Sequence, residues 1–183
     1  MGKVIGGMTH SVDGFVSDSI GDVRRLYPDL AELRNTEMLQ EEIRSTGAVV
    51  MDRRSYNMGD PDTFAENYEF QVPIFVVTHD IPEKKPKETE RLTITFVTEG
   101  VESAVAQAKA AAGDKDVILI GASINQQCIN LGLCDELHIG IMPVLLGEGR
   151  RLFEHIYTSH MTLEKIKVME SGPRTDIWFR IVK

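Results

Sequence analysis

The stretch from Val117 to Gly132 reads VILIGASINQQCINLG, and it decides how the rest of the chain is interpreted. A run of aliphatic residues stops at a Gly-Ala-Ser step, and a helical pattern follows it. In open α/β sheets such a step binds ligands, because free backbone N–H groups and the positive end of the helix dipole point there. Gly121, Ala122 and Ser123 therefore fit a phosphate-binding turn, although an ordinary strand-to-helix turn also explains them.

Strand and helix patterns alternate along most of the chain. Apolar or alternating segments predict strands at 3–8, 47–51, 72–78, 92–97, 117–120 and 136–144. Periodic segments predict helices at 36–45, at 101–112 and from about Ser123. Thr36 is a suitable N-cap for the first of these helices, and Gly113 is a suitable end for the second.

The last part of the chain has a different pattern. Two alternating segments, 162–171 and 175–183, flank the turn SGPR and predict an antiparallel hairpin. In its second strand Ile177, Phe179 and Ile181 share one face. The whole order predicts an α/β fold, in which helices flank a mixed, mostly parallel central sheet with an antiparallel C-terminal edge hairpin.

Composition limits the class of protein. The chain has 183 residues, 42% hydrophobic and 26% charged, and this length suits a single domain covering residues 1–183. The formal charge of −8 and the lack of a basic run argue against nucleic acid or an anionic membrane as a partner. No apolar run could cross a membrane and no signal peptide is recognisable, so we expect a cytoplasmic protein. Cys128 and Cys134 are expected to be reduced, structural thiols.

Two further strand ends carry groups that suit a phosphate. The segment MDRRSY places Arg53, Arg54 and Ser55 directly after a buried strand, where guanidinium and hydroxyl groups can bind an anion. A solvated arginine pair matched to a nearby aspartate explains the same residues. In VVTH, Thr78 and His79 follow another strand, although a single loop histidine is often incidental. Three such ends at one sheet edge would suit an extended ligand with several phosphates.

The order of these motifs resembles the dihydrofolate-reductase-like family, in its bacterial branch related to the reductase domain of riboflavin biosynthesis. The matching motifs span nearly the whole chain, and they are SVDGFV (11–16), MDRRSY (51–56), IFVVTH (74–79), ILIGAS (118–123) and CDELHIGIMPVLLGEGRRLF (134–153). The last motif is long and specific, whereas the others are short.

The resemblance implies a central sheet of about eight strands and NADPH as the hydride donor. It also implies a set of cofactor-binding residues. Arg53, Arg54 and Ser55 are expected to meet the 2′-phosphate and the pyrophosphate, and Thr78 and His79 to flank the adenine ribose. The pyrophosphate is expected to be cradled by Gly121, Ala122, Ser123 and Ile124. Val16 is expected to lie near the nicotinamide.

Two residues depart from the family pattern. Asp52 stands where the family usually has glycine, and its charge near a phosphate would weaken binding unless it turns away or pairs with an arginine. Ala122 stands where the family favours a second glycine, which leaves less room for the cofactor.

On the substrate side the sequence offers candidate contacts, and no catalytic acid or metal ligand is assigned. Asp29 is a candidate counterpart of the acidic residue that orients the pterin in dihydrofolate reductases, but an exposed acid opening a helix is the preferred interpretation. His10 and Ser11 are candidate substrate contacts. His138 is expected to face a partner or solvent. His155 and His160 are too poorly spaced to share one metal, so none is predicted.

Three further segments have expected structural or binding roles. Asp13 in SVDGF suits a structural turn. Arg150 and Arg151 fit either a loop that binds a substrate phosphate or a solvated turn. The hairpin and the apolar segment IGIMPVLL are candidates for a homodimer contact of the kind that relatives form.

The leading hypothesis is an NADPH-dependent reductase of a small heterocycle, and the substrate expected from the family is a riboflavin-type pyrimidine such as 5-amino-6-(5-phosphoribosylamino)uracil. A nucleotide-binding or regulatory protein of the same fold without turnover is the alternative, and a dihydrofolate reductase is a further one. An interaction module that uses the terminal hairpin has little support.

Overall fold

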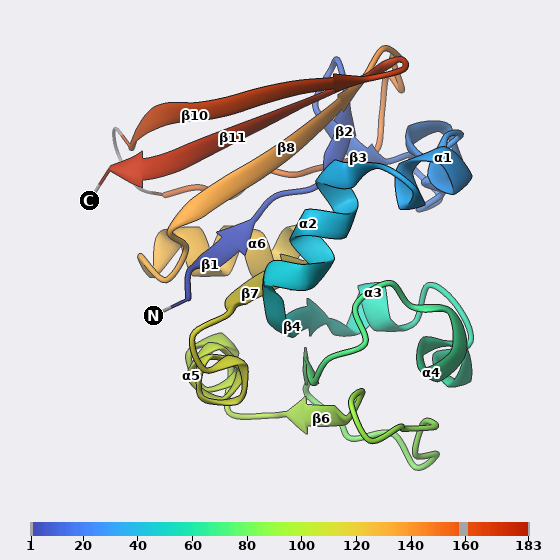
Figure 1. Ribbon diagram of the computed structural model, residues 1–183, viewed down its shortest axis with the longest axis vertical. Coiled ribbons are helices and arrows are strands. Elements are labelled where there is room, and N and C mark those ends of the chain that lie inside the picture. The colour runs from blue at the N-terminus through green and yellow to red at the C-terminus, as the bar shows by residue number, and fades with distance from the viewer. Residues whose placement is uncertain (1, 158–160, 183) are drawn as a thin grey trace.

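The computed structural model describes residues 2–157 and 161–182, and Figure 1 shows its arrangement. The strands are β1 (Val4–Gly6), β2 (Thr9–Ser11), β3 (Phe15–Ser17), β4 (Thr46–Asp52), β5 (Ile74–Val77), β6 (Ile94–Val97), β7 (Asp116–Ile120), β8 (Glu136–Met142), β9 (Arg150–Arg151), β10 (Thr162–Ser171) and β11 (Arg174–Val182). The α-helices are α1 (Leu30–Arg34), α2 (Glu37–Ser45), α3 (Arg53–Tyr56), α4 (Phe64–Asn67), α5 (Val101–Ala112) and α6 (Ala122–Asn130). Two short 3₁₀ helices are η1 (Arg24–Leu26) and η2 (Pro61–Thr63).

One mixed sheet organises the molecule. In the described residues its strand order is β10-β11-β8-β1-β7-β4-β5-β6, and β2 also pairs with β8. The pairs from β8 through β1, β7, β4 and β5 to β6 are all parallel. Strand β11 is antiparallel to both β8 and β10. The predicted α/β sheet with an antiparallel edge hairpin is therefore confirmed.

Both faces of the central parallel strands β4 and β7 are buried, which explains why these strands are continuous apolar runs. Along β4 the side chains alternate, so that Ala48 and Val50 join one core while Val49 and Met51 join the other. Helices α5 and α6 cover the first core, and α2 lies on the opposite face. This layering leaves the carboxyl ends of the parallel strands as the place where a ligand can approach.

Several local predictions agree with the structure. Helix α5 has the predicted bounds and ends at Gly113, and the Thr36 hydroxyl accepts a hydrogen bond from the Leu39 N–H at the start of α2. Both cysteines are buried, and burial raises the pKa of the Cys128 thiol to about 12. His160, considered above together with His155, lies outside the described residues.

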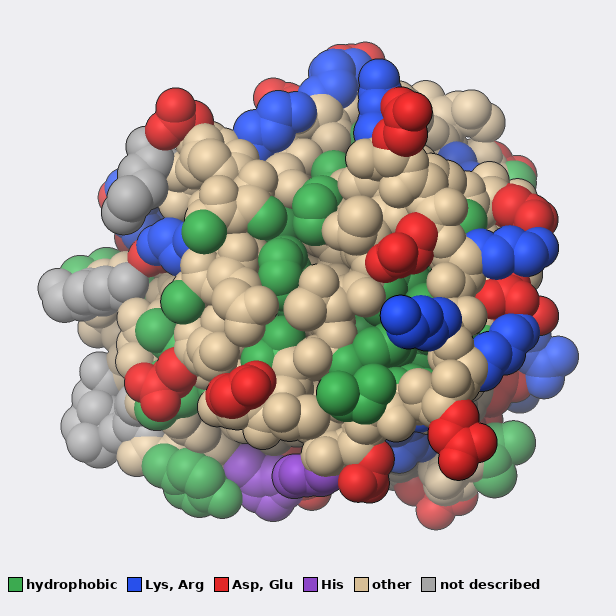
Figure 2. Space-filling view, turned by 90° about the horizontal axis from the view of Figure 1, so that it is seen from below, with side chains coloured by type: hydrophobic (Ala, Val, Ile, Leu, Met, Phe, Trp, Pro, Cys, Tyr) green, Lys and Arg blue, Asp and Glu red, His purple; other side chains and the backbone are tan. Residues whose placement is uncertain are grey.

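The sequence patterns missed short elements that connect the large ones. Strands β3 and β9 form a separate two-stranded antiparallel ribbon, and the loop before α2 contains η1 and α1. None of the described helices has the length and apolar character needed to cross a membrane. Figure 2 shows the end of the molecule at which α4, α5 and β6 lie, where apolar side chains gather near the centre and charges of both signs surround them.

Candidate cofactor cleft and adjoining cavity

Three parallel strands deliver the predicted cofactor residues to one edge of the sheet. Strand β4 is flanked by β5 and β7, so the segments that follow these three strands emerge side by side. A cleft of about 530 Å³ lies at this edge. Its lining includes six of the predicted cofactor residues, namely Arg53, Arg54, Thr78, His79, Ser123 and Ile124.

The other four predicted cofactor residues line a smaller recess beside the cleft. These residues are Val16, Ser55, Gly121 and Ala122. Arg54, Asp52 and Arg150 line both spaces, so we treat the cleft and the recess as neighbouring parts of one candidate site. The fold thus brings together side chains that are far apart in the sequence.

The groups at this site fit an anionic ligand. Helix α6 has no acidic residue in its first turn, and no side chain caps its N-terminus, so its first N–H groups face the site. The Arg53 Nη1 atom is buried without a hydrogen-bond partner among the described residues. A buried guanidinium nitrogen in this state favours an incoming acceptor such as a phosphate oxygen.

The Asp52 side chain does not turn away from the candidate site. Its side chain is 9% exposed and accepts a hydrogen bond from the Ser55 N–H at 2.7 Å, which caps the short helix α3. The backbone of Gly121 has a φ of 106°, and a Cβ there would collide with the Asp52 carboxylate. No ion pair between Asp52 and an arginine occurs in the part of the chain that the structure describes. Asp52 therefore places a carboxylate that has no ion-pair partner among the described residues beside the start of α6.

Other residues at the edge of the cleft and the recess make contacts within the protein itself. Ala122 is buried in the core cluster, where its methyl group packs, and it also lines the recess. The Thr78 hydroxyl donates to the Asp80 carbonyl at 2.9 Å and so closes a turn at the edge of the cleft. Arg150 lines the cleft, whereas the Arg151 guanidinium lies over the Phe15 ring and donates to the Asp13 carbonyl.

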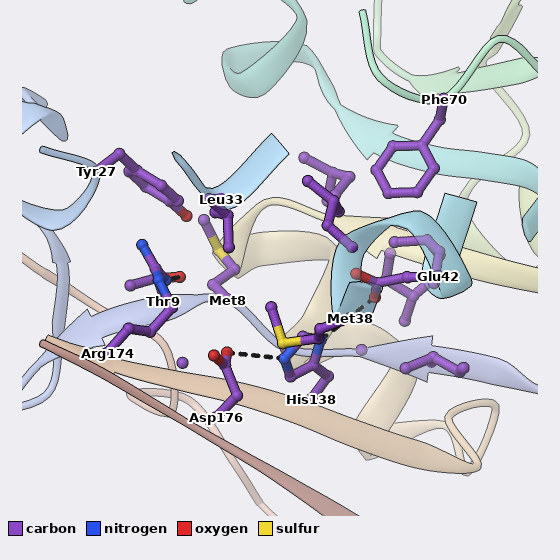
Figure 3. A pocket seen from close by; sticks show the side chains of 18 residues that line it. Met8, Thr9, Tyr27, Leu33, Met38, Glu42, Phe70, His138, Arg174 and Asp176 are labelled. Atoms are coloured by element: carbon purple, nitrogen blue, oxygen red, sulfur yellow. Dashed lines mark hydrogen bonds and ion pairs between the residues drawn. The ribbon is translucent and has the colours of Figure 1, made fainter. Parts of the chain in front are cut away.

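A second cavity, of about 180 Å³, lies beside this site on the α2 side of the sheet. Met8 lines both this cavity and the recess, so the two spaces are neighbours. Figure 3 shows Met38 and Glu42 of α2 above His138 of β8 and Asp176 of β11. Most of the other lining side chains are apolar, so the cavity is apolar except on one side. We call that side, formed by Glu42, His138 and Asp176, the polar floor.

The polar floor contradicts the prediction for His138. Its Nε2 lies 2.9 Å from Asp176 Oδ1 and its Nδ1 lies 3.3 Å from Glu42 Oε1, while the ring stacks on Trp178 at a centroid distance of 4.1 Å. Burial lowers the pKa of His138, but the hydrogen bonds to Asp176 and Glu42 outweigh it and raise the pKa to about 9. His138 faces neither solvent nor a partner, because α2 and β11 cover it.

Asp29 is not an exposed acid that merely opens a helix, so that preferred interpretation is wrong. It precedes α1 without capping it, and its carboxylate instead binds both Nε and Nη2 of Arg174 at 3.1 and 2.9 Å. These hydrogen bonds hold the pKa of Asp29 below its usual range. Arg174 is 1% exposed and also donates to the Leu26 carbonyl and the Thr9 hydroxyl.

The other two substrate candidates lie in a tight local turn. The Ser11 hydroxyl is fully buried, donates to Asp13 and accepts the Phe15 N–H. The Asp13 carboxylate in turn accepts the Leu146 and Gly147 N–H groups, in keeping with the structural role expected for it. The His10 Nδ1 lies 2.6 Å from the Ser11 carbonyl. Asp29, His10 and Ser11 are not among the residues that line the cleft, the recess or the cavity.

A comparison with known families agrees with this geometry. The family model described as the RibD C-terminal domain matches residues 2–175. The chain belongs to the RibD C-terminal domain family. Among curated proteins, the uncharacterized protein YyaP of Bacillus subtilis (strain 168) is 28% identical over 160 residues, which cover 82% of this chain and 80% of YyaP.

Solved structures agree on the fold of this RibD C-terminal domain protein. A putative riboflavin biosynthesis protein from Shewanella sp. PV-4 has a TM-score of 0.80 at 20% identity and covers 99% of both chains. Dihydrofolate reductase from Enterococcus faecalis, complexed with NADP(H), has a TM-score of 0.62 at 12% identity. The match covers 99% of this chain and 97% of that one. The resemblance stated from sequence motifs is therefore confirmed at the level of family and fold.

The family motifs did not reveal the polar floor of the cavity. Glu42, His138, Asp176 and Arg174 come together only through the pairing of β11 with β8 and the packing of α2. Alternation along β8 predicts which residues share a face with His138, but it does not say what covers that face. Of these residues only His138 lies in a family motif, so no spacing rule could have found the whole group.

Proposed function

We propose that this RibD C-terminal domain protein is an NADPH-dependent reductase that acts on a small heterocycle held in the cavity on the α2 side of the sheet. One observation carries the proposal: all ten predicted cofactor residues line the cleft and the recess, and Met8 lines both the recess and the cavity. Two neighbouring spaces, one lined with anion-binding groups and one mostly apolar, suit a hydride donor and its acceptor.

The chain's own residues have separate tasks in this proposal. NADPH, when bound, supplies the hydride. Arg53 and Arg54 bind the 2′-phosphate, and the N–H groups at the start of α6 bind the pyrophosphate. The apolar walls of the cavity keep water from the acceptor ring.

The substrate proposed first is a pyrimidine of the riboflavin type, in keeping with the family. A dihydrofolate reductase and a nucleotide-binding protein without turnover are the other outcomes that the experiments below distinguish. The homodimer and the cytoplasmic location that the sequence suggested stay predictions.

The cofactor proposal predicts a selective loss of NADPH affinity when either arginine is removed. We expect Arg53→Ala and Arg54→Ala each to weaken NADPH binding by about tenfold and to leave NADH binding nearly unchanged, because one charge-assisted contact to phosphate is lost. Titration followed by Trp178 fluorescence and by thermal shift measures both affinities. Arg25→Ala, an exposed arginine outside the cleft, is the control and retains wild-type affinity.

Two results decide among the functions. If NADPH neither quenches the fluorescence nor raises the melting temperature, the reductase proposal is wrong. If NADPH binds but its absorbance at 340 nm never falls with any pyrimidine, pterin or quinone acceptor, the protein without turnover is the better description.

Removing the charge of Asp52 should strengthen NADPH binding, whereas removing an arginine should weaken it. Asp52→Asn keeps the side-chain oxygen that caps α3 but removes the charge beside the start of α6, so we expect NADPH to bind about threefold to tenfold more tightly. Isothermal titration at low ionic strength measures the change. Asp60→Asn, which changes the capping aspartate of η2 outside the cleft, is the matched control. An unchanged or weaker affinity for the Asp52 variant contradicts the proposed position of the phosphates.

A further inference from the structure

The polar floor of the cavity contains an unused hydrogen-bond acceptor. Asp176 is 2% exposed, and its Oδ1 atom is bound by His138 Nε2 at 2.9 Å. Its Oδ2 atom is buried without a hydrogen-bond partner among the described residues. Figure 3 shows the carboxylate rising from β11 toward the cavity, beside His138. A buried carboxylate oxygen in this state is costly, and a ligand that donates an N–H or O–H to it removes that cost.

The neighbours of Asp176 hold it in place. His138 is fixed between Asp176 and Glu42 and stacks on Trp178, so it cannot turn away from either carboxylate. Gly140 supplies the space beside them, because a Cβ there would lie 2.7 Å from Thr9 Oγ1 and 3.1 Å from Asp176 Oδ1. The position of the acceptor is therefore set by three different elements, α2, β8 and β11.

The charge around the floor limits what can enter. Two carboxylates, Glu42 and Asp176, share the single imidazole of His138, and the nearby Arg174 is already bound to Asp29. A phosphate at this end of the cavity would meet net negative charge. A cavity of about 150 Å³ can hold a benzene ring, so 180 Å³ suits a single six-membered heterocycle.

We propose that Asp176 is the specificity-determining residue of the cavity, and that it selects a nitrogen heterocycle that presents an N–H donor edge to its Oδ2 atom. This inference rests on the proposed function, since it assigns the cavity to the substrate. A substrate that also carries a phosphate enters ring first and keeps the phosphate outside. The assignment also gives His138 a positioning role, because His138 keeps the carboxylate oriented without touching the ring.

The test compares two pyrimidines, one with amino groups that donate hydrogen bonds and one with methoxy groups that can only accept them. Wild-type protein should bind 2,4-diaminopyrimidine at least about tenfold more tightly than 2,4-dimethoxypyrimidine, because only the first can donate to a buried carboxylate. Isothermal titration, repeated with and without NADPH, measures both affinities. Equal affinities, or no binding of either ligand at millimolar concentration, overturns the inference without reference to any variant.

Asp176→Asn then tests the residue itself. Asparagine can still accept the His138 hydrogen bond through Oδ1 but places an N–H₂ donor where Oδ2 was, so the preference for the diamino ligand should fall by at least about tenfold. Glu136→Gln, which alters a buried carboxylate of β8 outside the cavity, should retain the wild-type preference. An Asp176→Asn protein that keeps the full preference overturns the inference.

NADPH affinity separates this inference from the proposed function. Asp176 does not line the cleft or the recess, so the Asp176→Asn protein should bind NADPH like the wild type. A wild-type protein that fails to bind NADPH but prefers the diamino ligand contradicts the reductase proposal alone. A wild-type protein that binds NADPH but shows no ligand preference contradicts the Asp176 assignment alone.

Discussion

Replacing Arg174 with methionine should lower the free energy of unfolding by about 3–5 kcal/mol, a large part of the 5–15 kcal/mol typical of a domain. Arg174 is almost completely buried and is bonded to Asp29, Thr9 and the Leu26 carbonyl. Its removal leaves the Asp29 carboxylate unpaired in a half-buried place and leaves two further acceptors unsatisfied. Urea denaturation followed by circular dichroism measures the loss.

Two other variants test this explanation. Arg24→Met removes a guanidinium that also binds an aspartate through two nitrogens, but this pair is exposed, so stability should stay close to that of the wild type. The double variant Arg174→Met/Asp29→Asn should regain part of the lost stability, because no unpaired carboxylate remains. A single Arg174→Met variant as stable as the wild type would show that the buried pair does not hold the loop of η1 and α1 to the sheet.

Stability should also fall as pH rises from about 6.5 to 9, because of His138. The imidazole lies between Glu42 and Asp176, which hold its pKa at about 9 in the folded protein, whereas an unfolded histidine has its ordinary value of 6.5. A raised folded pKa means that the stabilising contribution is complete below pH 6.5 and is lost as pH passes through 9. The slope is about 1.4 kcal/mol per pH unit, which gives a total loss of about 3 kcal/mol.

His138→Gln supplies the reference for this pH dependence. Glutamine fills a similar space and does not titrate, so the variant is less stable at pH 6 but should have a flatter profile up to pH 9. The difference between the two profiles removes the contributions of all groups that both proteins share. Parallel profiles would mean that His138 is neutral in the folded protein and that its hydrogen bonds join a neutral ring to the carboxylates.

The sequence predicted the fold, and the gathering of the proposed cofactor residues at one sheet edge, because their signals are local. Each predicted cofactor cluster follows directly after an apolar strand, and parallel strands bring such ends to one edge whatever their exact lengths. The same reasoning located α2 from a cap and an apolar face, and the hairpin from alternation about a turn. Residues 53–55, 78–79 and 121–124 therefore needed no knowledge of long-range contacts.

The substrate side could not be predicted in the same way. His138 meets Glu42 across 96 residues and Asp176 across 38, and Arg174 meets Asp29 across 145. Such contacts depend on which strands pair and on how a helix lies over them, which hydrophobic periodicity does not determine. Asp29 illustrates the limit, since its place before a helix suggested a cap while its real partner lies in the hairpin.

The distance in sequence between the parts of the site also bears on how the molecule folds. The cleft needs β4 to pair with β7, and this pairing joins residues as far apart in sequence as Thr46 and Asp116. The polar floor needs β11 to pair with β8 and also needs α2, whose Glu42 lies 96 residues from His138. Both parts therefore close long loops, which is slow. A refolding chain should regain the cleft and the polar floor in the same late stage, because neither can form from local contacts alone.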